Sequence, residues 1–221
     1  MNIETTRMII RDFTPEDAAD LHEIFGDDET MENCEPAYDF EKTKEFLTSF
    51  CIARNGAVAA VHKESGKMMG YILFNDADEG VYEMGWIYNR SFWRQGYAYE
   101  SCKAVIDYAF GELKAHKIFA EAIDTVKSVS LMQKLGMQLE GIQRSQTKDN
   151  HGNWADLYFY GLLEDDWRKM KCYSITSATR FSLVKRCRRI IKIIWNFWFR
   201  LCRRWKEAKI ASMQCCSMAS C

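Results

Sequence analysis

Residues 93–98 combine a glycine, a cation and the beginning of a helix, in the order Trp93, Arg94, Gln95, Gly96, Tyr97 and Ala98. Backbone N–H groups at a helix N-terminus are unpaired, and the helix dipole adds partial positive charge there. Gly96 lets the backbone approach a bound group closely, and Arg94 adds a full charge. The segment therefore predicts a phosphate site made mainly of backbone N–H groups. It matches neither G-x-x-x-x-G-K-S/T nor G-x-G-x-x-G, so an ordinary strand-to-helix turn is the alternative.

Glu83 is the one carboxylate in the apolar strand expected at residues 81–88 (VYEMGWIY). Burial raises the pKa of a carboxylate, which makes it a better proton acceptor near neutral pH. Glu83 is therefore a candidate general base. The alternative is a glutamate at the strand edge that faces water or pairs with a lysine.

Hydrophobic periodicity predicts the elements that must position these residues. We expect helices after Thr14 and at residues 41–51, 97–110 and 126–135, and strands at residues 8–13, 58–62, 68–74, 81–88, 117–123, 138–146 and 155–163. Short turns join the three strands between residues 58 and 88, which favours antiparallel pairing there. The order predicts an α/β (α+β) domain with a mixed, mostly antiparallel central sheet flanked by helices.

Three motifs resemble, in order and spacing, those of GNAT superfamily N-acetyltransferases. Gly96 and Ala98 occupy the last two fixed positions of the acetyl-CoA signature Q/R-x-x-G-x-G/A, while Trp93 replaces the usual Gln or Arg. Residues 83–86 (EMGW) and 130–137 (SLMQKLGM) resemble further motifs of the branch of ribosomal-protein-alanine N-acetyltransferases. The second of these is similar to N-x-x-S-x-x-L-x-x-K-L-G-F. The resemblance covers about residues 5–167.

The resemblance implies where acetyl-CoA binds. Strands 81–88 and 117–123 splay apart in the family and admit the pantetheine arm, so backbone groups of Trp86, Ile87 and Tyr88 are expected to bond it, with the pyrophosphate on residues 93–98. The family's asparagine at the beginning of the following helix is placed at Lys127, which either reaches a phosphate or is solvated. No metal is expected.

The resemblance also implies direct attack of an amine on the thioester, with Glu83 as the base. Met132 occupies the place where many relatives have a tyrosine that protonates the thiolate, so Ser130 is the candidate donor. A serine that bonds its own helix backbone is the alternative. The expected activity is N-acetylation of a small-molecule amine or a protein N-terminus. The alternative is a non-catalytic acyl-CoA-binding module. Acidic residues near the expected acceptor pocket would suit a cationic amine or would simply be solvated: Glu29, Glu32 and Glu35.

Charge divides the chain in two. Residues 1–167 hold 16 Lys and Arg against 30 Asp and Glu, which gives a net charge of −14. Residues 168–221 hold 14 Lys and Arg and a single acid, which gives +13. This predicts a catalytic domain at 1–167 and a basic, amphipathic tail at 168–221, helical around 183–210. Such a tail is expected to bind a membrane surface, to dock on the acidic domain or to mediate self-association, and nucleic acid is not expected. The chain would then be a monomer or a homodimer. The alternative is a disordered tail or one that is foreign to the family, such as a frameshifted or read-through end.

Cysteine usage favours a reducing compartment. The nine cysteines form no C-x-x-C pair, and no basic and apolar signal segment follows Met1. Free thiols predict a cytoplasmic location, peripheral to the membrane if the tail binds it. Within the acidic part, small core positions are expected for Cys34, Cys51 and Cys102.

Overall fold

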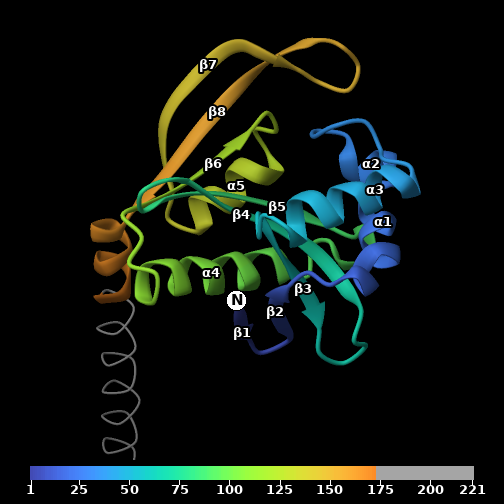
Figure 1. Cartoon of the computed structure of the whole chain (residues 1–221). Helices are drawn as coiled ribbons and strands as arrows, with labels where there is room; N and C mark the ends of the chain where they lie inside the picture. Colours follow the sequence, from blue (N-terminus) through green and yellow to red (C-terminus); the bar gives the residue numbers. More distant parts are fainter. Residues whose placement is uncertain (173–221) are drawn as a thin grey trace, which may run out of the picture. The chain divides into compact units, whose positions relative to one another are not determined.

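The computed structural model describes residues 1–172 and divides the chain into two compact units, Met1–Arg168 and Lys169–Cys221. The first unit is built on one eight-stranded sheet (Figure 1). The helix predicted at residues 183–210 lies outside the described residues. Among the described residues, no helix is both long and apolar enough to cross a bilayer.

The sheet has the spatial order β1-β2-β3-β4-β5-β6-β8-β7. Its strands are β1 (Asn2–Glu4), β2 (Met8–Asp12), β3 (Ala57–His62), β4 (Met68–Asp78), β5 (Val81–Tyr88), β6 (Lys117–Ala122), β7 (Gln138–Lys148) and β8 (Trp154–Leu163). The pair β5–β6 is parallel and the other six pairs are antiparallel. A parallel pair needs a crossover connection, and α4 (Tyr97–Gly111) provides it.

The other helical segments are η1 (Pro15–Asp17), α1 (Ala18–Phe25), α2 (Asp28–Met31), α3 (Phe40–Phe46), η2 (Leu47–Ile52), η3 (Arg90–Phe92) and α5 (Lys127–Lys134). Residues 164–172 are also helical. The side chain of Asp27 caps α2 and that of Asp39 caps α3, because each accepts hydrogen bonds from otherwise unpaired N–H groups.

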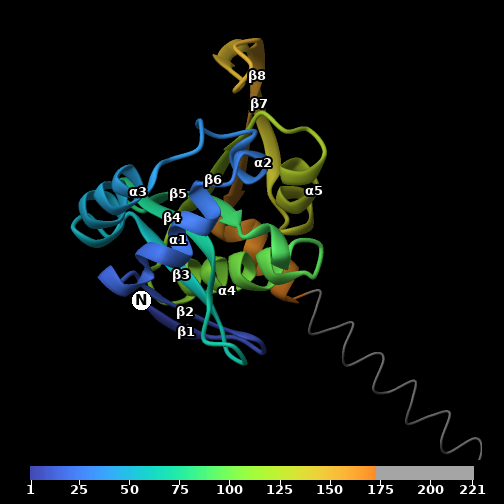
Figure 2. The ribbon, with the colours of Figure 1, turned by 90° about the vertical axis from the view of Figure 1, so that its right-hand side faces the viewer.

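Two apolar cores form because β3 and β4 are covered on both faces. Alternate side chains of β3 enter different clusters: Val58 and Ala60 pack with α4 and α5, whereas Ala59 and Val61 pack with α1 and η2. We call these the α4 core and the α1 core. Figures 1 and 2 also show the β7–β8 hairpin extending beyond the rest of the sheet.

The predicted order of strands and helices, and the mixed sheet, are confirmed. Two short elements, β1 and α2, were not predicted, because neither spans enough residues to show a period. Strands β4 and β7 extend beyond their predicted ends, since their distal residues are mostly polar and continue no apolar alternation. Cys51 and Cys102 are buried as expected, but Cys34 is exposed, so its predicted core position was wrong.

Candidate functional site

The sheet opens between β5 and β6. Pairing joins Val81, Tyr82 and Glu83 to Lys117, Ile118 and Phe119, and extends no further between these two strands. The distal half of β5 stays paired with β4, and residues up to Ala122 of β6 stay paired with β8. Residues 84–88 of β5 and residues 120–122 of β6 therefore do not pair with each other. An unpaired edge inside a sheet offers N–H and C=O groups to an extended ligand.

The register of β4 and β5 decides which backbone groups face the opening. Asn89 N–H donates to the carbonyl oxygen of Met69 at 2.9 Å, and Ile87 lies opposite Tyr71. Antiparallel strands direct alternate residues toward one neighbour, so the backbone of Ile87 faces β4. The backbone groups of Trp86 and Tyr88 therefore face the opening.

Hydrogen bonds hold both the backbone carbonyl and the side chain of Tyr88. Its carbonyl oxygen accepts a hydrogen bond of 2.7 Å from the indole N–H of Trp93, which ties the following loop to the strand. Its side chain is buried in the α4 core, where the hydroxyl and the Ser101 hydroxyl lie 2.5 Å apart. Burial raises the pKa of Tyr88 well above its usual range. This tyrosine therefore fixes the geometry of the opening.

The loop after β5 has the conformation of an anion cradle. Gly96 has φ 82° and is the N-cap of α4, with no side-chain cap, while Arg94 has φ 57°. The backbone N–H of Glu100 bonds the Gly96 carbonyl oxygen, as the first helical bond. N–H groups of the first turn that precede it need a partner from outside the helix. Arg94, Gln95 and Gly96 are exposed, so the cradle is accessible.

Helix α5 lies beside this loop. The carboxylate of Asp124 accepts from the backbone N–H of Val126 at 2.8 Å and of Lys127 at 3.1 Å, and so caps the helix. The Lys127 ammonium lies 5.3 Å from the centre of the Trp93 ring. A loop tryptophan and a lysine of α5 therefore come together, although 34 positions separate them in the sequence.

The serines of α5 differ in exposure. Ser130 is exposed, Ser128 is partly buried, and Met132 belongs to the α4 core. Counted back from Gly136, the spacing N-x-x-S-x-x-L-x-x-K-L-G falls on Thr125 and Ser128 rather than on Lys127 and Ser130. Ser128 is therefore a second candidate for the serine of this motif.

Two carboxylates lie on one face of the sheet, on opposite sides of the opening. Burial of the β6 residues Ile118 and Ala120 in the α4 core directs Glu121 to the other face. Glu83 shares that face, because Met84 points into the α4 core. Desolvation raises the pKa of Glu83, and desolvation together with repulsion from Glu83 raises that of Glu121. Glu121 is not among the site residues expected from sequence, although the alternation of β6 places it on this face.

A rim borders this face. The side-chain amide of Asn150, at the tip of the β7–β8 hairpin, donates to the carbonyl oxygens of Met31 at 2.8 Å and Glu35 at 3.2 Å. The carboxylate of Glu35 accepts from the Tyr38 hydroxyl at 2.6 Å, and Glu29 pairs with Arg90. The acidic residues of this loop are thus partly neutralised by the protein itself.

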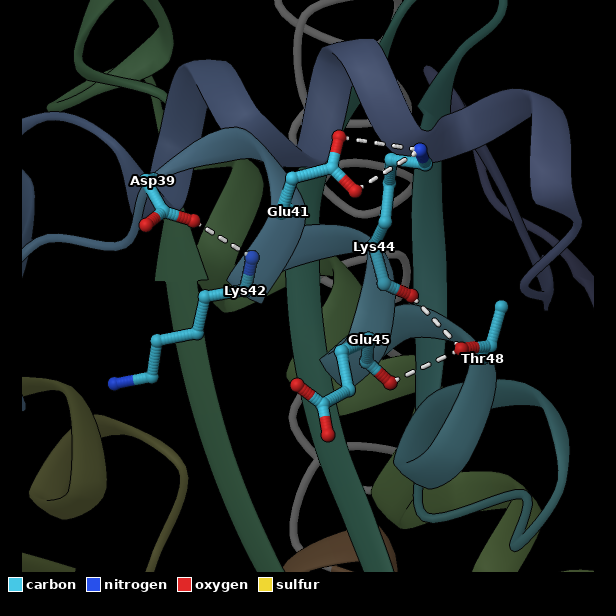
Figure 3. Close-up of a pocket in the computed structure, with 6 residues that line it drawn as sticks. All are labelled: Asp39, Glu41, Lys42, Lys44, Glu45 and Thr48. Carbon is cyan, nitrogen blue, oxygen red and sulfur yellow. Dashed lines mark hydrogen bonds and ion pairs between the residues drawn. The ribbon is translucent and has the colours of Figure 1, made fainter.

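One surface hollow lies along α3 (Figure 3). Its polar groups bond one another: Lys44 pairs with Glu41, Asp39 accepts from the Lys42 backbone, and Thr48 bonds the backbone of its own helix. Such a surface offers no convergent unpaired groups. Within residues 1–172, no cluster of three or more His, Cys, Asp or Glu is arranged to hold a metal ion.

Comparison with known proteins identifies the domain. The model of the acetyltransferase (GNAT) domain matches residues 7–138. The uncharacterized N-acetyltransferase YnaD of Bacillus subtilis is 30% identical over 171 residues, covering 76% of this chain and 99% of the relative.

Two solved structures share the fold. A GNAT-family acetyltransferase from Bacillus anthracis matches with a TM-score of 0.69 and 28% identity, covering 75% of this chain and 99% of the other. The ribosomal-protein-S5-alanine acetyltransferase from Vibrio fischeri matches with a TM-score of 0.64 and 21% identity, covering 76% and 98%. The chain belongs to the GNAT acetyltransferase domain family.

Proposed function

We propose that the chain transfers an acetyl group from acetyl-CoA to a primary amine. The observation that supports this most strongly is the opening between β5 and β6, which ends at an uncapped, glycine-initiated helix. An extended arm with a phosphate at one end fits that combination, because strand edges bond amides and the helix N-terminus attracts anions.

The strand register narrows the set of β5 residues proposed to bind the coenzyme. Trp86 presents its backbone N–H and C=O to the opening and Tyr88 its N–H, because the Tyr88 carbonyl is bonded to Trp93. The register directs the backbone of Ile87 to β4 and leaves it a supporting role. The pyrophosphate is proposed to lie on the backbone of residues 94–98, with Trp93 and Lys127 as its neighbours from the loop and from α5.

Glu83 is proposed to accept the amine proton, directly or through water. Its raised pKa keeps it a competent base near neutral pH, and its side chain lies on the face opposite the α4 core. Glu121 shares this face and is proposed to hold the incoming ammonium before the proton is lost. A backbone N–H of β5 that faces the opening would stabilise the negative charge on the thioester oxygen.

A serine of α5 is proposed to protonate the departing thiolate. Ser130 is the candidate from the resemblance of residues 130–137, and Ser128 is the candidate from the count back from Gly136. The Tyr88 hydroxyl is a poor donor because it is buried against Ser101. Alanine variants of the two serines distinguish them, since loss of the proton donor lowers kcat without changing coenzyme affinity.

The acceptor is proposed to be a small-molecule amine or a protein N-terminus. The Vibrio fischeri protein is named for the alanine of a ribosomal protein, but at 21% identity it supports only the fold. The alternative, a non-catalytic acyl-CoA-binding module, is favoured by one observation: Met132, at the place of the expected tyrosine, is a core residue.

Thiol release from acetyl-CoA, measured against polyamines, amino acids, aminoglycosides and peptides with different N-terminal residues, tests the proposal. Turnover with one class identifies the acceptor. Micromolar binding of coenzyme A without turnover on any amine would favour the binding module, and absence of coenzyme binding would contradict both functions.

The location and the partners are further proposals. We infer a cytoplasmic enzyme, monomeric or homodimeric, whose basic segment 168–221 contacts an anionic membrane surface or a second copy. Cosedimentation of the full chain with vesicles containing anionic lipid, and light scattering, test these two outcomes separately. Dispensability of the segment in both assays would contradict the proposal.

A further inference from the structure

Arg7 joins the N-terminal strands to the first turn of α4. It lies between β1 and β2, outside every motif identified in the sequence. Its Nε donates to Glu100 Oε2 at 2.7 Å, and its backbone N–H donates to Oε1 of the same carboxylate at 2.9 Å. Partial burial opposes ionisation of Glu100, but hydrogen bonds from Arg7 and Thr5 outweigh it and hold the pKa of Glu100 below its usual range.

The same guanidinium reaches two further parts of the loop. Its Nη1 donates to the carbonyl oxygen of Gln95 at 3.0 Å, and its central carbon lies 4.0 Å from the centre of the Tyr97 ring. The Tyr97 hydroxyl also lies 3.2 Å from His62 Nε2. One side chain therefore contacts the residues on both sides of Gly96 and the helix that follows.

The bond to Gln95 determines where the N–H of Gly96 points. The Gln95 carbonyl and the Gly96 N–H belong to one planar trans peptide, so they point in opposite directions. Anchoring the carbonyl on Arg7 therefore aims the N–H away from Arg7. The guanidinium and the Tyr97 ring lie on the carbonyl side of this peptide, so the N–H is directed away from both.

The loop needs such an anchor. Arg94 has φ 57°. This conformation raises the free energy of any residue that carries a side chain, so it persists where neighbouring contacts enforce it. Arg94, Gln95 and Gly96 are exposed and bury little apolar surface of their own. The restraint must therefore come from contacts such as those of Arg7, Tyr97 and Glu100.

We infer that Arg7 is a positioning residue that sets the phosphate loop in its binding conformation before the coenzyme arrives. It acts through the Gln95–Gly96 peptide and not by touching phosphate. The inference rests on the proposed function, because it assigns that loop to the coenzyme. It deepens the proposal by adding a residue that lies 88 positions before Gln95 and 93 positions before Glu100 in the sequence.

The test is the Kd of coenzyme A, measured by calorimetry on the full chain well below the melting temperature. Arg7→Met is expected to raise the Kd about tenfold, the effect of losing one charge-assisted anchor. Arg7→Lys keeps the charge but cannot make all three contacts, so its Kd should lie between those of the wild type and of Arg7→Met. The amide resonance of Gly96 should shift in Arg7→Met, and coenzyme should perturb it less than in the wild type.

Arg11→Met is the matched control. Arg11 makes a bidentate pair with Asp17 from the same region of the chain and is about as exposed as Arg7, but its pair does not involve the phosphate loop. This variant should lower the melting temperature and leave the Kd within about twofold of wild type.

Equal Kd values for Arg7→Met and Arg11→Met would overturn the inference while leaving the proposed function intact. A wild-type chain that binds no coenzyme A would overturn both. If Arg7→Met does not fold, Arg7→Lys and Glu100→Gln decide the matter, because an unchanged Kd in both would show that the anchor does not act on the coenzyme.

Discussion

Glu83 and Glu121 are the residues whose surroundings most alter their acid–base chemistry at the proposed site. Both pKa values are raised, so each carboxyl group loses its proton at a higher pH than an exposed glutamate does. Repulsion between two carboxylates is mutual, so a change in one alters the titration of the other. The pair can therefore be tested through the pH dependence of the reaction.

Glu83→Gln is expected to lower kcat/KM by about 10² to 10⁴-fold, because the general base is lost. In the wild type, kcat/KM should fall as the pH drops through the raised pKa of Glu83, since only the ionised form accepts a proton. The variant should lack this limb. Full activity of Glu83→Gln at every pH would contradict the assignment.

Glu121→Gln is the companion variant. Because the two carboxylates titrate as a coupled pair, removing the Glu121 charge should move the acidic limb to lower pH. If Glu121 holds the acceptor, the KM for the amine should also rise. A profile identical to that of the wild type would show that the two carboxylates do not interact in the free enzyme.

Asp17 is a single residue whose charge contributes to the stability of the fold. Burial opposes its ionisation, but hydrogen bonds from Arg11 and Thr14 outweigh this and hold its pKa below the usual range. A lowered pKa contributes stability that is present above the unfolded-state pKa and is lost as pH falls through the folded-state pKa. Asp17→Asn should therefore lower the free energy of unfolding by about 1–3 kcal/mol at pH 7. Chemical denaturation should show the difference shrinking at acid pH.

The proposed phosphate loop can be tested at the scale of one element by replacing its glycine. Gly96 has φ 82°, and an added Cβ would meet only Arg7 Nη2, at 3.6 Å, so the cost of Gly96→Ala is conformational and not steric. It should lower the free energy of unfolding by about 1–2 kcal/mol and weaken coenzyme A binding. Calorimetry and thermal melting measure the two effects.

Gly66→Ala is the control for that variant. Gly66 has φ 70° in the turn between β3 and β4, and a Cβ there would meet nothing within 4 Å. The backbone strain of Gly66→Ala should be similar to that of Gly96→Ala, but the Kd of coenzyme A should stay unchanged. A similar change of Kd in both variants would mean that Gly96 acts through general stability alone.

The boundary of the folded unit is a question for the whole molecule. The indole N–H of Trp167 donates to Asp107 at 2.7 Å, and its ring lies 5.4 Å from that of Phe110 in α4. Both core clusters draw their buried residues from positions before 163. A chain that ends at Cys172 therefore retains every residue on which the sheet and its cores depend.

Truncation after Cys172 is expected to leave the melting temperature and the coenzyme Kd unchanged. Truncation after Glu164 should lower the free energy of unfolding by about 2 kcal/mol, through loss of the Trp167 contacts. Circular dichroism and calorimetry provide both readouts. Unfolding of the longer truncated chain would contradict the proposed domain boundary near residue 167.

The sequence alone was sufficient for the order of elements, the mixed sheet and the family. Periodicity, turn glycines and caps act over a few residues, so local pattern determines where helices and strands begin. The glycine-initiated beginning of α4, on which the proposed phosphate site rests, was also predictable, because a glycine before an amphipathic helix leaves N–H groups without a side-chain cap. The spacing from Gly136 back to Ser128 is likewise a property of the sequence alone.

Tertiary structure decided which residues meet. The register of β4 and β5 selects Trp86 and Tyr88 over Ile87, and the parallel pairing of β5 and β6 brings Glu121 to the same face as Glu83. Arg7 reaches Gln95 and Glu100 across more than 80 positions. Strand pairing and long-range ion pairs depend on global packing, for which one sequence carries no local period. The fold was therefore readable from the chain, whereas the partners of its reactive and positioning groups were not.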